Sequence, residues 1–235
     1  MSEELDVRSA VKETLPTVFG YIGIGVAFGV VGRAAGLSPW LIFLMSLIVY
    51  GGSAQFITVG MLASHSPILS IVFSTFLVNS RMILMSMTLA PYFTEYSLGK
   101  NLWLGTLLTD ESFALAMNKL NFTDRRLSFP WMNTTNMISY STWVLSSFLG
   151  AILGNFIGSP EKLGLDFALM AMFIGLLILQ MISDRKMNLN LQFILVGITL
   201  ALIYVGMIFI PVNLLIVLVT LLGCGIGVVI KHAFF

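Results

Sequence analysis

The sequence predicts an all-α polytopic integral membrane protein, with about eight transmembrane helices in one bundle. Apolar residues make up 57% of its 235 residues and charged residues only 10%, whereas a soluble domain carries about 25% charged residues. The mean hydropathy of +0.96 is correspondingly high. Apolar stretches of about 20 residues recur along the chain, and this is the length that an α-helix needs to cross a bilayer.

The same composition excludes other classes of protein. Too few charged residues remain to cover the surface of a soluble enzyme, and a disordered chain needs low hydrophobicity. The net charge of +1 excludes electrostatic capture of nucleic acid as the main activity. Cys224 is the only cysteine, and His65 and His232 match no metal-ligand spacing. We therefore expect no enzyme activity, no cofactor and no bound metal.

Charged residues and Pro or Gly breaks divide the chain into eight expected spans. They lie near residues 16–36, 40–62, 67–90, 98–118, 130–157, 164–183, 188–209 and 212–231. Lipid offers the backbone no hydrogen-bond partners, so each span is expected to be helical. Residues 1–15 are expected to form a short cytoplasmic or surface segment, and residues 16–235 a single transmembrane domain.

The Lys and Arg residues of the loops predict the orientation, because cytoplasmic loops carry an excess of them. With eight spans, one side carries eight of these residues and the other three. The eight are Arg8, Lys12, Lys119, Arg125, Arg126, Arg185, Lys186 and Lys231, and the three are Arg33, Lys100 and Lys162. We therefore expect both termini in the cytoplasm, whereas a seven-span count would place the C-terminus outside.

Small residues recur at spacings of four along several spans, as they do where membrane helices pack closely. These pairs are Gly25 with Gly29, Gly150 with Gly154, and Gly223 with Gly227. We interpret them as helix-packing positions rather than gating positions.

Four positions in spans two to four converge on one depth. With about 1.5 Å of rise per residue, each lies about 14–18 Å from the outer end of its span. They are Gly51, Asn79, Arg81 and Asp110. This depth is close to the middle of an apolar layer about 30 Å thick, where charges are costly and usually functional.

The paired glycines of span two predict a break in that helix. They lie in the segment Tyr50-Gly51-Gly52-Ser53-Ala54-Gln55. Each glycine costs about 1 kcal/mol of helix propensity relative to alanine. We expect an interruption at Gly51-Gly52, with Ser53 to Gln55 lining a polar cavity, because many transporters hold an amino acid at such breaks. The alternative is a straight helix whose glycines permit a tight crossing.

The charged side chains complete the candidate site. Arg81 is expected to meet a substrate carboxylate, while Asp110 or Glu111 meets an ammonium group or carries a proton. Adjacent helical residues point about 100° apart, so the two acids cannot both face one partner. The expected substrate-binding residues are Tyr50, Gly51, Gly52, Ser53, Gln55, Asn79 and Arg81. The alternative is that Arg81 and Asp110 form a structural ion pair.

The same segments resemble the AzlC family. The resemblance is carried by Gly20-Tyr21-Ile22-Gly23, Tyr50-Gly51-Gly52-Ser53-Ala54-Gln55-Phe56, Asn79-Ser80-Arg81, Thr109-Asp110-Glu111-Ser112-Phe113 and Gly164-Leu165-Asp166-Phe167-Ala168-Leu169. Many members carry a residue such as His after the arginine, where this chain has Met82. The resemblance implies a bacterial inner-membrane exporter of branched-chain amino acids, driven by protons and working with a small, separately encoded AzlD-type membrane subunit. A small-solute channel and a non-transporting structural subunit are the competing hypotheses.

Overall fold

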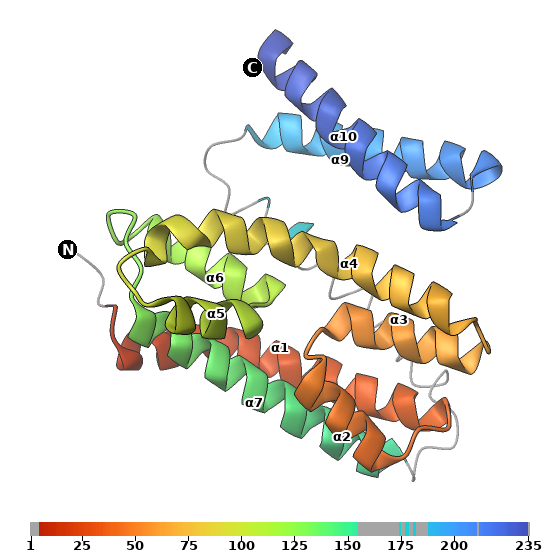
Figure 1. Ribbon diagram of the computed structural model, residues 1–235. Coiled ribbons are helices and arrows are strands. Elements are labelled where there is room, and N and C mark those ends of the chain that lie inside the picture. The colour runs from red at the N-terminus through yellow and green to blue at the C-terminus, as the bar shows by residue number, and fades with distance from the viewer. Residues whose placement is uncertain are drawn as a thin grey trace. The chain divides into compact units, whose positions relative to one another are not determined.

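The computed structural model describes residues 5–154, 174, 177–178, 181, 188–210 and 212–234, and every regular element within these ranges is a helix (Figure 1). Among the described residues, three helices are long and apolar enough to cross a membrane: Val7–Ala34, Ile68–Phe93 and Leu189–Phe209. The all-helical membrane fold is thus confirmed, but the count of eight spans is not. The expected span 164–183 lies almost entirely outside the described residues.

The chain divides into two compact units, Met1–Leu176 and Leu177–Phe235. The first contains α1 (Val7–Ala34), α2 (Pro39–Ile48), α3 (Gly52–Ala63), α4 (Ile68–Leu89), the short 3-10 helix η1 (Ala90–Phe93), α5 (Leu98–Thr106), α6 (Asp110–Leu120) and α7 (Phe129–Leu153). The second contains α9 (Leu189–Phe209) and α10 (Val212–Phe234).

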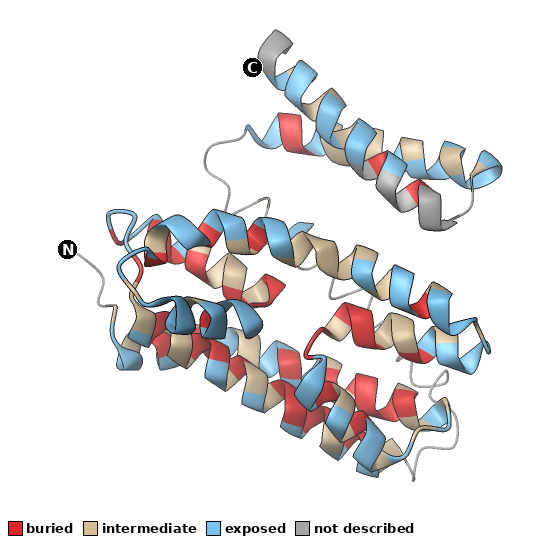
Figure 2. Ribbon diagram, viewed as in Figure 1, coloured by how far each residue is buried: buried red, intermediate tan, exposed pale blue. Residues whose placement is uncertain are grey.

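Helices α1 and α7 pack along their whole length and carry many of the buried residues of the first unit (Figure 2). The closest approach uses the predicted glycines. A Cβ at Gly29 would overlap the backbone of Ser147 and Ala151, and a Cβ at Gly150 would overlap the backbone of Val26. Only glycine permits this spacing, so the packing interpretation of these positions is confirmed.

Helix α1 begins at Val7, earlier than the expected start near residue 16. Asp6 caps the helix by accepting a hydrogen bond of 2.8 Å from the Ser9 amide, and this bond lowers the pKa of the Asp6 carboxyl. Val7 to Ala34 then form one continuous helix, with Pro16 inside it.

Helices α2 and α3 form a hairpin of half-helices, and they do not cross the bundle. At 10 and 12 residues they are about 15 and 18 Å long, roughly half of an apolar layer. Gln55 of α3 donates to Ser46 of α2, and Ser147 of α7 also donates to Ser46. Both half-helices therefore lie beside the C-terminal half of α1 and α7, and their junction lies near the middle.

Helices α5 and α6 form a second hairpin, which enters from the opposite end. Asn136 of α7 donates to the carbonyl of Leu104 in α5, at 3.2 Å. At the far end of α6, Lys119 pairs with Glu13 near the start of α1, at 2.6 Å. The junction at residues 107–109 thus lies near the middle of the bundle, and both outer ends lie beside the N-terminal end of α1.

The structure therefore does not confirm that segments 40–62 and 98–118 each cross the membrane, because each divides into two half-helices. The break at Gly51-Gly52 is confirmed, because α2 ends at Ile48 and α3 begins at Gly52. The second break was not predicted. It occurs because the Thr109 side chain starts a new helix, which competes with continuation of α5.

The two hairpins belong to an inverted repeat. Helix α1 followed by α2–α3 corresponds to α4 followed by α5–α6, with α1 and α4 running in opposite directions. The directions follow from pairs that join α3 to α4, Thr58 with Thr75 and Ser53 with Arg81. Inverted repeats with broken helices at the midplane are a common transporter architecture. We did not predict this repeat from the sequence.

The repeat also places some loops at a different end of the bundle from the one that the eight-span prediction gave. Arg125 donates to the Tyr92 hydroxyl and Tyr96 accepts from the Phe129 amide, so the α4–α5 connection lies at the same end as the N-terminus. Within the described part of the first unit, that end carries Arg8, Lys12, Lys100, Lys119, Arg125 and Arg126, and the other end carries Arg33. Lys100 therefore lies on the opposite side from the one predicted, and the charge asymmetry becomes larger.

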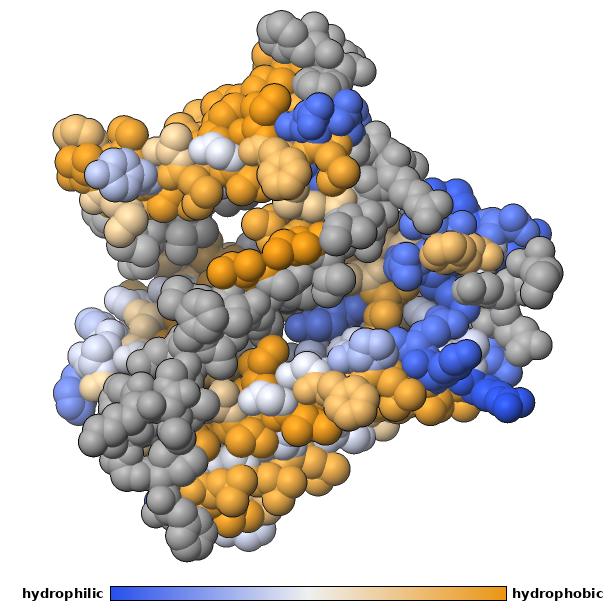
Figure 3. Space-filling model, turned by 180° about the vertical axis from the view of Figure 1, so that it is seen from behind, coloured by the Kyte–Doolittle hydropathy of each residue, from blue (hydrophilic) through white to orange (hydrophobic). Residues whose placement is uncertain are grey.

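The outer surface is largely hydrophobic. On α4, Leu69 is 81% exposed and Leu84 is 67% exposed, which suits a face that meets lipid tails. Figure 3 shows broad hydrophobic areas on one face, with many of the hydrophilic side chains gathered on one side of the view.

The second unit is an antiparallel pair of helices. Gly206 of α9 lies against Leu215 of α10, and Gly227 lies beside Leu195. Gly223 also faces this partner helix, at Thr199. The small residues of this part of the chain therefore serve packing as well.

The α1–α7 contact generates a stability prediction. Gly29→Ala should lower the free energy of unfolding by about 1–3 kcal/mol, because the new methyl group meets backbone atoms that cannot move aside. Gly23→Ala in the same helix is the matched control, since its Cβ meets nothing within 4 Å. Thermal unfolding in detergent should show a lower Tm for the first variant only. Equal Tm values would contradict the packing role.

Candidate functional site

The two helix breaks meet near the middle of the first unit and enclose a small polar cavity. Seven elements or junctions contribute to its wall. The lining residues are Tyr21, Tyr50, Gly51, Gly52, Ser53, Arg81, Met82, Thr109, Asp110, Glu111 and Trp143. The structure thus brings together Gly51, Arg81 and Asp110, which the sequence predicted to lie at one depth.

The break before α3 is a tight, unusual turn. Tyr50 has a φ of 40°, in the left-handed region that an aromatic residue rarely adopts. Its ring packs edge-on against Tyr140, with 4.8 Å between ring centroids. Gly52 lets the Trp143 ring approach, since a Cβ there would lie 3.0 Å from that ring. Aromatic packing on both sides holds a backbone conformation that is costly by itself.

The N-terminus of α3 has no side-chain cap. Gly51 is its N-cap residue, with a φ of −140° and a ψ of 88°, and it has no side chain to accept a bond from the first turn. The first amide groups of a helix lack intrahelical acceptors and carry partial positive charge. This helix end therefore offers donors to an anion beside the cavity.

The N-terminus of α6 is capped and acidic. Thr109 accepts from the Ser112 amide and Ser112 accepts from the Thr109 amide, which forms a reciprocal capping box. Asp110 and Glu111 occupy the first turn, where the helix dipole favours negative charge. The N-terminus of α3 therefore offers donors to an anion, whereas the N-terminus of α6 brings two carboxyl groups to the same cavity.

Arg81 connects three elements at the cavity. Its guanidinium lies 2.7 Å from Oδ2 of Asp110 and donates to Oγ of Ser53 at 2.8 Å. The Asp110 side chain is 11% exposed and that of Arg81 is 33% exposed. Removing either charge would strand the other in a largely buried place.

Glu111 has different partners from its neighbour Asp110. Its Oε2 accepts a hydrogen bond of 2.6 Å from the Tyr21 hydroxyl of α1. That hydroxyl is also 2.9 Å from Oγ1 of Thr109. The expectation that the two acids face different partners is confirmed.

Two expected site residues lie outside the cavity wall. Gln55 is fully buried, donates to Ser46 and accepts from the Trp143 indole, so its amide joins α2, α3 and α7. Oδ1 of Asn79 lies beside Gly51, 3.5 Å from where a Cβ would be, and makes no hydrogen bond to the described residues.

Sequence reasoning missed Tyr21, Thr109, Met82 and Trp143 as site residues. Tyr21 and Trp143 belong to helices without intramembrane charge, so no local signal marked them. Thr106 precedes Asp110 by four residues, a spacing that would place both on one face of a continuous helix. Because α5 ends at Thr106, that alignment is lost, and the Thr106 hydroxyl donates to the carbonyl of Leu102 instead.

The cavity has a volume of about 20 Å³, which is room for about one water molecule. A free amino acid does not fit without movement of the surrounding helices. Among the described residues there is no group of three His, Cys, Asp or Glu side chains that could hold a metal ion.

Half-helices that meet around charged groups inside a helical membrane unit are typical of membrane transport proteins. The comparison with known proteins agrees with this class. Residues 16–157 match the family described as AzlC protein, and the chain belongs to that family.

Three relatives of the chain are described as membrane or transport proteins. The chain is 34% identical to the inner membrane protein YgaZ of Escherichia coli, over 87% of this chain and 83% of that protein. It is 26% identical to the branched-chain amino acid transport protein AzlC of Bacillus subtilis, over 76% of this chain and 69% of that protein. An uncharacterized membrane protein of Helicobacter pylori is 28% identical over 83% of both chains. No solved structure is significantly similar.

The ion pair generates a prediction on stability. Arg81→Ala should lower the free energy of unfolding by about 2 kcal/mol, less than for a fully buried pair because the arginine is partly exposed. The double variant Arg81→Ala with Asp110→Asn should recover part of this loss, since no charge is then left alone. Tm values of the two variants and the wild type in detergent provide the measurement. A double variant less stable than the single one would mean that the two charges are not coupled.

Proposed function

We propose that the protein is a secondary transporter that exports branched-chain amino acids, namely valine, leucine and isoleucine, and couples their movement to protons. The proposal includes a small AzlD-type membrane subunit as partner and the bacterial inner membrane as location. The name of the Bacillus subtilis relative supports the substrate class, and that of the Escherichia coli relative supports the location. The meeting of two half-helices around Arg81, Asp110 and Glu111 is the observation that carries the proposal.

The carboxylate of the amino acid is assigned to the α3 side of the cavity. The N-terminal amides of α3, the hydroxyl of Ser53 and the guanidinium of Arg81 are all donors there. A carboxylate accepts several such bonds at once, and half-helix N-termini hold substrate carboxylates in other transporters. Asn79 and Tyr50 lie beside this position with an amide oxygen and a hydroxyl that the described residues leave without hydrogen bonds.

The ammonium group is assigned to Asp110. In the closed cavity Asp110 is paired with Arg81. A zwitterion can replace this pair by two new ones, its carboxylate on Arg81 and its ammonium on Asp110. This exchange leaves no charge unpaired, which lowers the cost of binding in a place of low dielectric.

The proton is assigned to Glu111. The Tyr21 hydroxyl has one proton to donate and can also accept. When Glu111 is ionised, Tyr21 donates to it and accepts from Thr109. When Glu111 is protonated, it donates to Tyr21, and Tyr21 donates to Thr109. Both states satisfy every hydroxyl, so Glu111 can exchange a proton without stranding a buried group.

The closed cavity requires alternating movement of the surrounding helices. Each hairpin faces one end of the first unit, so displacement of α5–α6 would open one end and displacement of α2–α3 the other. The end that carries six Lys and Arg residues is assigned to the cytoplasm, together with both termini. Gln55 acts here as a fixed link between α2, α3 and α7.

Transport is tested by counterflow of labelled leucine and valine in liposomes, with and without the small partner subunit. We expect saturable exchange when both subunits are present, because the site binds a zwitterion at two defined charges. Arg81→Ala should abolish exchange while the protein still inserts into the membrane.

The competing hypotheses give different results in the same liposomes. A channel would show non-saturable flux or ion conductance. A structural subunit would show no change in counterflow when Arg81 is replaced.

The proton assignment is tested by comparing Glu111→Gln with Asp110→Asn. Glutamine cannot ionise, so Glu111→Gln should lose transport driven by a pH gradient but keep at least about a third of wild-type counterflow. Asp110→Asn should lose both activities, since the ammonium loses its counter-charge. Gradient-driven transport that survives in Glu111→Gln with its normal pH dependence would exclude Glu111 as the proton carrier.

A further inference from the structure

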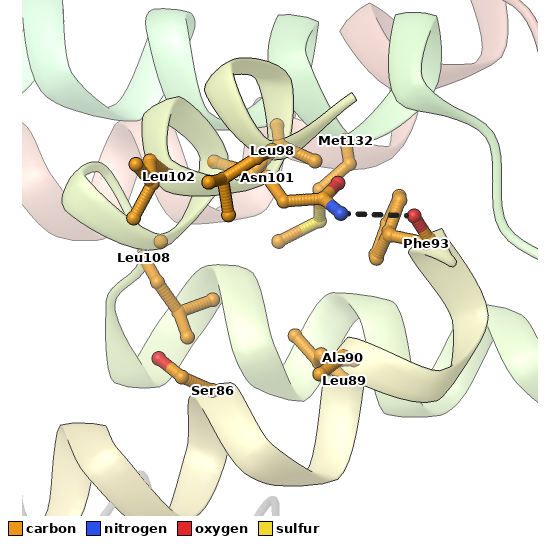
Figure 4. Close-up of a pocket in the computed structure, with 11 residues that line it drawn as sticks. Ser86, Leu89, Ala90, Phe93, Leu98, Asn101, Leu102, Leu108 and Met132 are labelled. Atoms are coloured by element: carbon orange, nitrogen blue, oxygen red, sulfur yellow. Dashed lines mark hydrogen bonds between the residues drawn. The ribbon is translucent and has the colours of Figure 1, made fainter. Parts of the chain in front are cut away.

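A second, larger pocket lies between α4, η1, α5 and α7, in the half of the first unit that contains the N-terminus (Figure 4). Its volume is about 190 Å³. Its inner wall is formed by buried Leu89, Phe93, Leu104 and Leu108, and by Met132 of α7. No charged side chain lines it. None of the roles assigned above uses this pocket.

The pocket and the polar cavity are neighbours on two elements. Leu108 lines the pocket, and the next residue, Thr109, lines the polar cavity. On α4, Met82 lines the polar cavity and Ser86 lines the pocket one turn later, about 6 Å along the helix.

Met82 lies at the partition between the two spaces. It is half-buried and packs against the hydrophobic cluster that contains Leu89, Phe93 and Leu108. A methionine side chain has three rotatable bonds and adapts readily to a changed neighbour. Met82 thus contacts both the polar cavity and the apolar cluster that forms the pocket wall.

We propose that this pocket binds the aliphatic side chain of the transported amino acid, while its ammonium and carboxylate lie at Asp110 and Arg81. The inference rests on the proposed function and adds the determinant of side-chain selectivity. Leu108 and Thr109 are consecutive residues, with Cα atoms about 3.8 Å apart, so an isobutyl group that extends over three carbon–carbon bonds of about 1.5 Å is long enough to pass from one wall to the other. A cavity of about 150 Å³ lined by apolar residues accommodates benzene, so this pocket has room for leucine or isoleucine.

Asn101 contributes a polar group to the pocket wall. Its amide nitrogen donates to the carbonyls of Phe93 and Tyr96, at 3.1 and 3.4 Å, which fixes the turn at the pocket wall. Its Oδ1 is buried and accepts nothing from the described residues. A lipid chain and an aliphatic side chain would leave this acceptor equally unsatisfied, so it does not select between them. The continuity of the pocket with the charged cavity, at Leu108 and Thr109, favours the side chain of the amino acid as the occupant.

The test fills the pocket without disturbing the packing. Gly105 lines the pocket, and a Cβ there meets nothing within 4 Å, so Gly105→Leu introduces a side chain into open space. Gly99→Leu is the matched control on the same helix, since its Cβ also meets nothing and it does not line the pocket. Both variants are assayed with the small subunit in liposomes, and the readout is the KM for leucine against the KM for alanine.

We expect Gly105→Leu to raise the leucine KM at least tenfold relative to the alanine KM, and Gly99→Leu to leave the ratio unchanged. A second variant, Leu102→Ala, enlarges the pocket at an exposed position and should admit phenylalanine. An unchanged leucine-to-alanine ratio in Gly105→Leu, as expected if a lipid chain fills the pocket, overturns the inference while wild-type transport still supports the function. A wild-type protein that exchanges no aliphatic amino acid overturns both.

Discussion

The structure depends on the meeting of two helix N-termini inside a membrane bundle. Each brings amide groups without intrahelical acceptors and a positive dipole end into a place where lipid supplies no hydrogen bonds. The chain satisfies one end with Thr109, Ser112 and two acids, and leaves the other without a side-chain cap. That difference creates a cavity with a cationic and an anionic side, which is the charge pattern of an amino-acid zwitterion.

The inverted repeat explains why these ends meet. Helix α1 and helix α4 run in opposite directions, and each is followed by a hairpin that reaches the middle from its own end. The contacts across the repeat are matched, since Tyr21 of α1 bonds Glu111 of α6 and Arg81 of α4 bonds Ser53 of α3. One of these contacts joins a hydroxyl to a carboxyl group, and the other joins a guanidinium to a hydroxyl. Helix α7, which is not part of the repeat, packs closely against α1 at Gly29 and Gly150 and so holds α1 in place.

The sequence predicted several elements of the site because their signals are local. Charges at mid-span are rare enough to be noticed, so Arg81, Asp110 and Glu111 were found, and the glycine pair revealed the break before α3. Gln55 was predicted to line the cavity from its place in the same motif, but its side chain turns to Ser46 and Trp143. Tyr21 and Trp143 reach the site from helices that are distant in sequence, so no local pattern predicted them as site residues.

The sequence by itself determined that the chain is a helical membrane protein, that a helix breaks at Gly51-Gly52, and which charged residues lie within apolar segments. These properties follow from hydropathy, helix propensity and the cost of burying charge, which act residue by residue. Only the tertiary structure decided that segments 40–62 and 98–118 fold back and that Lys100 lies at the same end of the first unit as the N-terminus. It also decided that Asp110 pairs with Arg81 while Glu111 bonds Tyr21. After each break, packing against α1, α4 and α7 sets the direction that the chain takes. An apolar half-helix by itself is equally compatible with continuing across the membrane and with folding back.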